Sequence, residues 1–103
     1  MAEFVKVAST SDIPEGTCKA FDVKLNEFVI AHTADGFHAI ADECSHDGSP
    51  FGESKLDGFE VICPRHGARF DVRSGDVTAP PAVVPVDKYE LKVEGNDILV
   101  RLD

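Results

Sequence analysis

Four residues with metal-binding side chains fall into two short segments of the chain. Cys44 and His46 are separated by one residue, and Cys63 and His66 by two. Glycines and prolines surround both pairs, so we expect loops on which neighbouring side chains can converge on one centre. Thiolate and imidazole together suit zinc or an iron–sulfur centre, whereas magnesium and calcium prefer oxygen ligands. The sequence therefore predicts a metal site formed by two loops.

Two kinds of metal centre fit these ligands. A structural zinc ion would take all four in a tetrahedron. A [2Fe–2S] cluster would take both cysteines on one iron and both histidines on the other. Zinc sites usually keep like ligands together in the sequence, whereas each loop here supplies one cysteine and one histidine. The spacing favours the cluster, and zinc stays open as the alternative.

The segments around these ligands resemble those of Rieske-type ferredoxins, which are components of bacterial multicomponent ring-hydroxylating dioxygenases. The motif of Cys-x-His, sixteen residues and Cys-x-x-His is complete, and the flanking CPRHG and Phe70-Asp71 also match. The C-terminal PPAVVPVDKYELKVEGNDILV resembles the closing strands of that family, so the similarity covers nearly the whole chain. The resemblance implies one Rieske-type [2Fe–2S] cluster, and it implies these ligands: Cys44, His46, Cys63 and His66.

The same resemblance implies a function and its partners. A flavoprotein reductase that oxidises NAD(P)H would supply single electrons, and a terminal oxygenase of aromatic hydrocarbon catabolism would receive them. The protein would carry electrons and would not be an enzyme on its own, so no catalytic residue is expected. Two other functions stay open: the small subunit of a nitrite-reductase-like complex, and a zinc-stabilised binding module without a redox role.

Two positions beside the second loop predict a low reduction potential. High-potential Rieske proteins of respiratory complexes have serine and tyrosine hydroxyls near the cluster sulfurs and a disulfide between the loops. The matching positions here look like Ala68 and Phe70, which carry no hydroxyl, and Arg65 occupies the place of a loop cysteine. Fewer hydrogen bonds to sulfur stabilise the added electron less, so we expect a low potential.

Short runs of alternating apolar and polar residues surround the loops and predict β-structure. We expect strands over 3–8, 18–25, 27–33, 36–42, 56–62, 68–72, 83–86, 89–93 and 98–102. Asp35-Gly36 and Asp57-Gly58 are turn signals. No long window has a helical period with a cap. The resemblance implies that these strands form a Rieske iron–sulfur fold in one domain over 1–103. This domain would have an antiparallel β-sandwich base (about 1–42 and 78–103) and a small cluster-binding subdomain of two loops (about 43–77).

Other residues that could do chemistry have plainer interpretations. Cys18 lies in an expected strand and is interpreted as a small core residue. His32 and His38 also lie in expected strands, as surface or hydrogen-bonded core histidines. Pro80-Pro81 stiffens a loop, and by resemblance this loop covers the cluster from water.

The charge of the chain argues against a nucleic-acid partner. Its 19 acids and 10 bases give a net charge of −9, whereas a phosphate-backbone binder needs a basic face. The stretch from 27 to 60 holds one base, Lys55, and eight acids: Glu27, Asp35, Asp42, Glu43, Asp47, Glu53, Asp57 and Glu60. These acids could dock a basic partner or simply form a solvated face. Arg65, Arg69 and Arg73 near the second loop complicate a uniformly acidic docking face, unless Arg69 or Arg73 pairs with neighbouring acids.

The N-terminal sequence and the lengths of the apolar runs give an expectation about location. MAEFVKVAST lacks the basic start and long apolar core of a signal peptide. No apolar run approaches the roughly 18 residues of a membrane span. We therefore expect a soluble cytoplasmic protein, monomeric in solution, that binds neither membrane nor nucleic acid.

Overall fold

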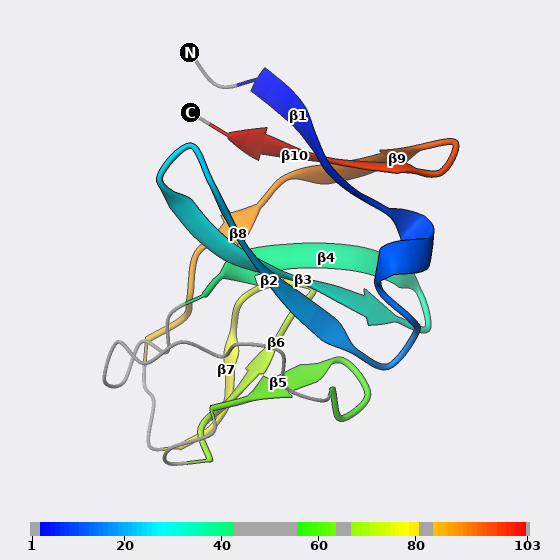
Figure 1. Ribbon diagram of the computed structural model, residues 1–103. Coiled ribbons are helices and arrows are strands. Elements are labelled where there is room, and N and C mark those ends of the chain that lie inside the picture. Colours follow the sequence, from blue (N-terminus) through cyan, green and yellow to red (C-terminus); the bar gives the residue numbers. More distant parts are fainter. Residues whose placement is uncertain (1–2, 43–55, 64–66, 81–83, 103) are drawn as a thin grey trace.

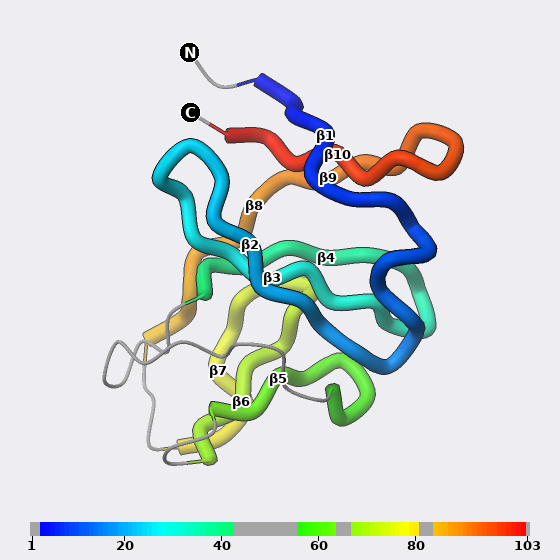
Figure 2. The backbone as a smooth tube through the Cα atoms, viewed as in Figure 1, coloured from blue at the N-terminus to red at the C-terminus, as the bar shows by residue number. Residues whose placement is uncertain are grey.

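The computed structural model describes residues 3–42, 56–63, 67–80 and 84–102. In this part of the chain ten strands form three antiparallel sheets, and one turn of 3₁₀ helix covers Thr10–Asp12 (Figure 1, Figure 2). None of the helical structure described is long and apolar enough to cross a membrane. The predicted all-β class with antiparallel sheets is confirmed.

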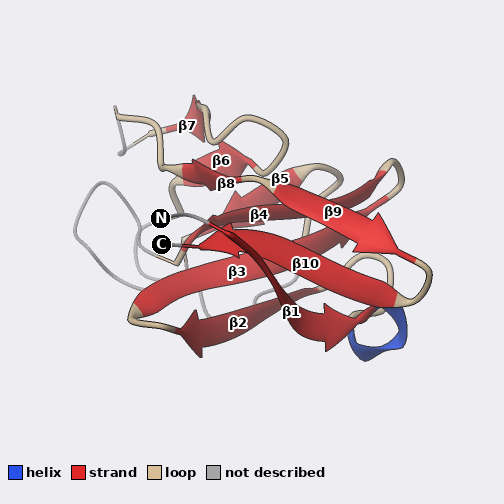
Figure 3. Ribbon diagram, turned by 90° about the horizontal axis from the view of Figure 1, so that it is seen from above, coloured by secondary structure: helices blue, strands red, loops and turns tan. Residues whose placement is uncertain are grey.

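The central sheet lies between the other two (Figure 1). It has the order β2 (Cys18–Val23), β3 (Asn26–Thr33), β4 (Gly36–Ala41) and β8 (Lys88–Tyr89). The sheet at the two ends of the chain has the order β1 (Glu3–Ser9), β10 (Asp97–Leu102) and β9 (Leu91–Glu94). The third sheet has the order β5 (Glu60–Ile62), β6 (Arg69–Asp71) and β7 (Val77–Ala79). Seen from above, β1, β10 and β9 lie over the strands of the central sheet (Figure 3).

Strand β3 connects the two hydrophobic cores of the protein. Successive side chains of a strand point to opposite faces of its sheet. Phe28 and Ile30 belong to the core shared with the terminal sheet, whereas Val29 and Ala31 belong to the core shared with β5 and β6. All four side chains are fully buried. The continuous apolar run of β3 thus reflects burial on both faces.

The hairpin turns follow the sequence signals with one correction. Asp35-Gly36 lies at the predicted turn, and Thr33 pairs with Gly36 across it. The strand predicted to run to residue 25 ends instead at Val23. Lys24 and Leu25 form the turn, with φ of 53° and 66°, and Leu25 is 98% exposed. A two-residue turn with both φ positive matches the twist of the flanking strands, even without glycine.

Two other predicted strands are shortened or interrupted. Of the strand predicted over 56–62, only Glu60–Ile62 is extended, because Asp57 and Glu60 form an isolated bridge around a turn with Gly58 at φ 63°. The strand predicted over 89–93 breaks at Glu90, where the chain passes from the central sheet to the terminal sheet. The two parts, β8 and β9, pair with β4 and β10 respectively. Local composition does not encode this choice of partner strand.

The strand predicted over 83–86 is wrong for the residues that the structure describes. Residues 84–86 lie outside the strands, and the backbone N–H of Val86 donates to the carbonyl oxygen of Gly75 at 2.9 Å. No strand is predicted over Val77–Ala79, yet this segment forms β7 and pairs with β6. Pro80 follows β7, whereas Pro81 lies outside the described residues.

Candidate metal centre

Cys63 follows strand β5 and begins the turn that leads into β6. Its backbone N–H donates to the carbonyl oxygen of Ala68 at 2.7 Å, and Gly67 N–H donates to the carbonyl oxygen of Cys63 at 2.9 Å. Gly67 has φ of +76°, a conformation that favours glycine. The two ends of the turn are therefore joined by backbone hydrogen bonds, which fix the position of the Cys63 backbone.

The Cys63 side chain is buried in an apolar surrounding. Cys63 is 1% exposed, and it shares a core cluster with the fully buried Ala68 and Phe70. Neither of these neighbours carries a hydroxyl that could donate to sulfur. Burial and the lack of hydroxyls on Ala68 and Phe70 both disfavour added negative charge, so the expectation of a low reduction potential stands as a prediction.

The other three predicted ligands lie outside the described residues: Cys44, His46 and His66. Within the described ranges no group of three or more histidine, cysteine, aspartate or glutamate side chains could hold a metal ion. The structure therefore describes one of the four predicted ligands. Its buried thiol and the soft donor set of the sequence motif fit an iron–sulfur cluster.

Arg69, next to this turn, forms ion pairs across the third sheet. Its Nε lies 2.6 Å from Oε1 of Glu60, and its Nη2 donates to Oδ2 of Asp57. These hydrogen bonds, first the one donated to Asp57 and then the one donated to Glu60, raise the pKa of the Arg69 guanidinium. Its positive charge is thus balanced by two carboxylates, and the predicted pairing of Arg69 is confirmed.

Arg73 pairs in the same way with a nearby acid. Its Nη2 and Nε lie 2.7 Å and 3.1 Å from the two carboxylate oxygens of Asp71. This side-chain hydrogen bond is the main reason that the pKa of Asp71 is lowered. The guanidinium also lies 3.9 Å from the ring centre of Phe59, a cation–π geometry. The predicted pairing of Arg73 is likewise confirmed.

Both strand histidines have hydrogen-bond partners, as the sequence predicts. His32 Nδ1 lies 2.8 Å from the carbonyl oxygen of Ile13, and its ring stacks on Phe37 at 4.0 Å. His38 Nε2 lies 2.8 Å from Oδ1 of Asp35. Hydrogen bonds from Thr33 and then from His38 lower the pKa of Asp35.

Cys18, at the start of β2, is 4% exposed and lies in the same core cluster as Cys63. Its interpretation as a small core residue is confirmed.

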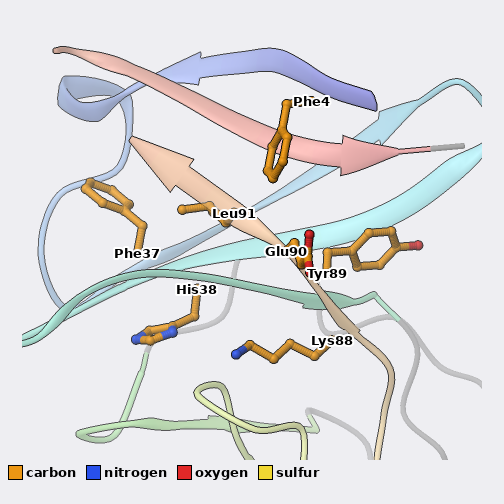
Figure 4. A pocket seen from close by; sticks show the side chains of 7 residues that line it. All are labelled: Phe4, Phe37, His38, Lys88, Tyr89, Glu90 and Leu91. Atoms are coloured by element: carbon orange, nitrogen blue, oxygen red, sulfur yellow. The ribbon is translucent and has the colours of Figure 1, made fainter. Parts of the chain in front are cut away.

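A surface hollow lies beside strands β4, β8 and β9 (Figure 4). Its volume is about 400 Å³, and it is lined by Phe4, Phe37, His38, Lys88, Tyr89, Glu90 and Leu91. Among the described residues, neither Cys63 nor any residue of the third sheet lines it. This hollow is therefore not the metal centre.

Sequence reasoning did not single out Gly75, which contacts Val86 next to the core of Cys63. The only available signal is the Ser74-Gly75 dipeptide, a common turn sequence. It predicts a turn but not which segment approaches it.

Comparison with known proteins identifies relatives of the whole chain. Residues 3–90 match the family model described as Rieske [2Fe–2S] domain. The ferredoxin component of biphenyl 2,3-dioxygenase from Rhodococcus jostii (strain RHA1) is 34% identical, over 95% of this chain and 92% of that protein.

Two solved structures are similar along the same length. The ferredoxin of carbazole 1,9a-dioxygenase from Nocardioides aromaticivorans IC177 is 38% identical, with a TM-score of 0.86, over 94% of this chain and 95% of that one. A ferredoxin in a complex of reduced oxygenase and oxidized ferredoxin of carbazole 1,9a-dioxygenase is 31% identical, also with a TM-score of 0.86, over 93% and 99%. The family and fold implied by the sequence motif are thereby confirmed.

Proposed function

The chain belongs to the Rieske [2Fe–2S] domain family, and we propose that it is the ferredoxin of a multicomponent ring-hydroxylating oxygenase system. As a member of this family it binds one Rieske-type [2Fe–2S] cluster, which supplies a one-electron redox couple when bound. It carries electrons and is not catalytic alone. The observation that carries the proposal is the buried Cys63 thiol on a hydrogen-bonded turn, within the residues that match the family.

The cluster ligands in this proposal come from the two loops of the sequence motif: Cys44, His46, Cys63 and His66. The described part of the second loop supports it. The Cys63 backbone is tied to Ala68 and Gly67, and its side chain faces an apolar core. A ligand held this way needs little rearrangement when the charge of the centre changes, which suits rapid electron transfer. We propose a cluster-binding subdomain at about 43–77 on a base formed by 1–42 and 78–103.

The proposed partners are a flavoprotein ferredoxin reductase as donor and a terminal oxygenase as acceptor. The relatives named above are ferredoxins of dioxygenases, and one lies in a complex with an oxygenase. The net charge of −9 favours brief, steered encounters with basic docking surfaces. We propose a soluble, monomeric protein of the cytoplasm that binds neither membrane nor nucleic acid.

Spectroscopy with metal analysis on one purified sample tests this proposal. Electron paramagnetic resonance (EPR) of the dithionite-reduced protein should give a rhombic signal with the low average g value of a histidine-ligated cluster. Iron and acid-labile sulfide should each approach two per chain, as a [2Fe–2S] cluster requires. A colourless sample without this signal, holding one zinc ion per chain, would contradict the proposal and favour a structural zinc site.

A further inference from the structure

Gly75 makes an unusually close contact with a segment that returns from the C-terminal side of the chain. It lies in the turn between β6 and β7 with φ of +83°. Its N–H donates to the carbonyl oxygen of Asp71 at 2.7 Å, and its own carbonyl oxygen accepts from Val86 N–H at 2.9 Å. The two backbones therefore lie against each other, although ten residues lie between Gly75 and Val86 in the sequence.

The contact leaves no room for a side chain at residue 75. A Cβ built there would lie 2.2 Å from the carbonyl oxygen and 3.3 Å from the carbonyl carbon of Val86. Both are backbone atoms, so no rotamer change relieves the overlap. Among the described glycines with positive φ, only Gly75 has any heavy atom within 4 Å of such a Cβ. Residue 75 must therefore be glycine for two reasons, the close contact with Val86 and the positive φ.

Val86 is fixed from both sides. Val86 N–H bonds to Gly75 on one side. On the other side, the following residue, Asp87, accepts a hydrogen bond at its carbonyl oxygen from Ala41 N–H at 2.9 Å. Val86 is 8% exposed and belongs to the same buried cluster as Cys63, Ala68 and Phe70. The position of Val86 therefore helps to close the apolar core that contains Cys63.

We infer that Gly75 is a positioning residue for the redox centre, because its lack of a side chain seats Val86 in the core around Cys63. This inference rests on the proposed function, in which Cys63 is a cluster ligand. A methyl group at residue 75 would push the Val86 backbone away and admit water to that core. The apolar shell around a metal site controls its solvent access and thereby its reduction potential. Since reduction adds one negative charge, a wetter core would raise the potential.

The test compares Gly75→Ala with Gly16→Ala in the cluster-loaded protein. Gly16 has φ of +87°, close to that of Gly75, but its added Cβ would meet nothing within 4 Å. Both variants therefore carry the same backbone strain, and only Gly75→Ala carries the overlap. The two readouts are hydrogen exchange of the peptide that contains the Val86 amide, by mass spectrometry, and the midpoint potential.

We expect Gly75→Ala to speed exchange at Val86 at least tenfold and to shift the reduction equilibrium by up to about tenfold, or ~59 mV for one electron, toward the reduced form. Gly16→Ala should change neither value. Faster exchange at Val86 with an unchanged potential would overturn the inference, as would equal shifts in both variants.

A second variant covers the case in which Gly75→Ala does not fold. Val86→Ala removes the core side chain without an overlap, and it should raise the potential in the same direction. An unchanged potential in Val86→Ala would overturn the inference. Failure of the proposed function would appear separately, as a wild-type protein that contains no iron–sulfur cluster.

Discussion

The backbone N–H of Cys63 donates a 2.7 Å hydrogen bond to the carbonyl oxygen of Ala68, which joins the two ends of the turn between β5 and β6. A residue fixed in this way presents its side chain in one direction. Here that side chain is a thiol with 1% exposure. Strands β5 and β6 thus hold a cysteine with a hydrogen-bonded backbone and a buried side chain, which is unlike a reactive surface thiol.

The first prediction separates this cysteine from the other buried one. We expect Cys63→Ser to lose most of the cluster, because a serine hydroxyl binds iron poorly at neutral pH. The control is Cys18→Ala, which removes a buried thiol of the same core cluster and should keep the iron content of the wild type. Cluster content is measured in both variants from iron, acid-labile sulfide and the visible spectrum. Equal cluster loss in the two variants would show that core damage, not ligand loss, is responsible.

The second prediction concerns the expected low potential. Ala68→Ser and Phe70→Tyr would each place a hydroxyl near Cys63, within the same buried cluster. A hydrogen bond to sulfur stabilises the reduced state, so each variant should raise the midpoint potential, by up to about 59 mV for a tenfold change in the equilibrium. The wild-type potential should lie toward the lower end of the Rieske range of roughly −150 to +300 mV.

The matched control for these variants is Val72→Thr. It adds a hydroxyl at another fully buried position of that cluster. Its potential should stay at the wild-type value, although burying an unpaired hydroxyl costs roughly 1–3 kcal/mol of stability. A wild-type potential well above zero would refute the low-potential prediction.

The third prediction uses the ion pair of Arg73 and Asp71. The pair lowers the pKa of the Asp71 carboxyl from its usual 3.8. A carboxyl with a lowered folded-state pKa stabilises the fold above its unfolded-state pKa, and this contribution is lost as the pH falls through the folded-state value. Arg73→Met should therefore reduce the free energy of unfolding at pH 7, by a small amount because the pair is partly exposed.

The stability difference between wild type and Arg73→Met should shrink as the pH falls below 3.8, where Asp71 becomes protonated first in the unfolded protein and, at lower pH, in the folded protein as well. A remainder should persist, because the guanidinium also lies over the Phe59 ring at 3.9 Å. Urea unfolding of both proteins at pH 7 and near pH 3 measures this. A difference that grows on acidification would contradict the assigned role of the pair.

Local sequence signals predict the elements whose conformation is decided locally. Asp35-Gly36 marks a tight hairpin, and the apolar run of Phe28 to Ala31 marks a buried strand. In both cases a few adjacent residues carry the physical cause. The metal motif is also local, because Cys63 and His66 are close in sequence.

The remaining features depend on which segments meet in space. Val77–Ala79 is a strand because β6 lies beside it. The predicted strand is interrupted at Glu90 because β8 and β9 belong to different sheets. The same limit applies to the site. Ser74-Gly75 predicts a turn, but no sequence pattern tells that Val86 approaches it to 2.9 Å.

The last prediction distinguishes a docking surface from a merely solvated face in the acidic stretch 27–60. In the described part of this stretch, Asp35 pairs with His38, and Asp57 and Glu60 pair with Arg69. Glu27, at the start of β3, is exposed and faces Asp22 across the hairpin. Two carboxylates side by side form a local negative potential that a basic partner would sense.

We therefore expect Glu27→Gln to slow electron transfer to a basic acceptor such as cytochrome c by about twofold at low salt, with the effect lost at high salt, where charges beyond a few ångströms are screened. Glu15→Gln is the control, because Glu15 is exposed, lies outside the stretch and carries the same charge. Stopped-flow rates at several ionic strengths measure both variants. If the two variants slow the reaction equally, only net charge matters and the stretch is a solvated face; if Glu27→Gln alone slows it, the acidic stretch is where basic partners dock.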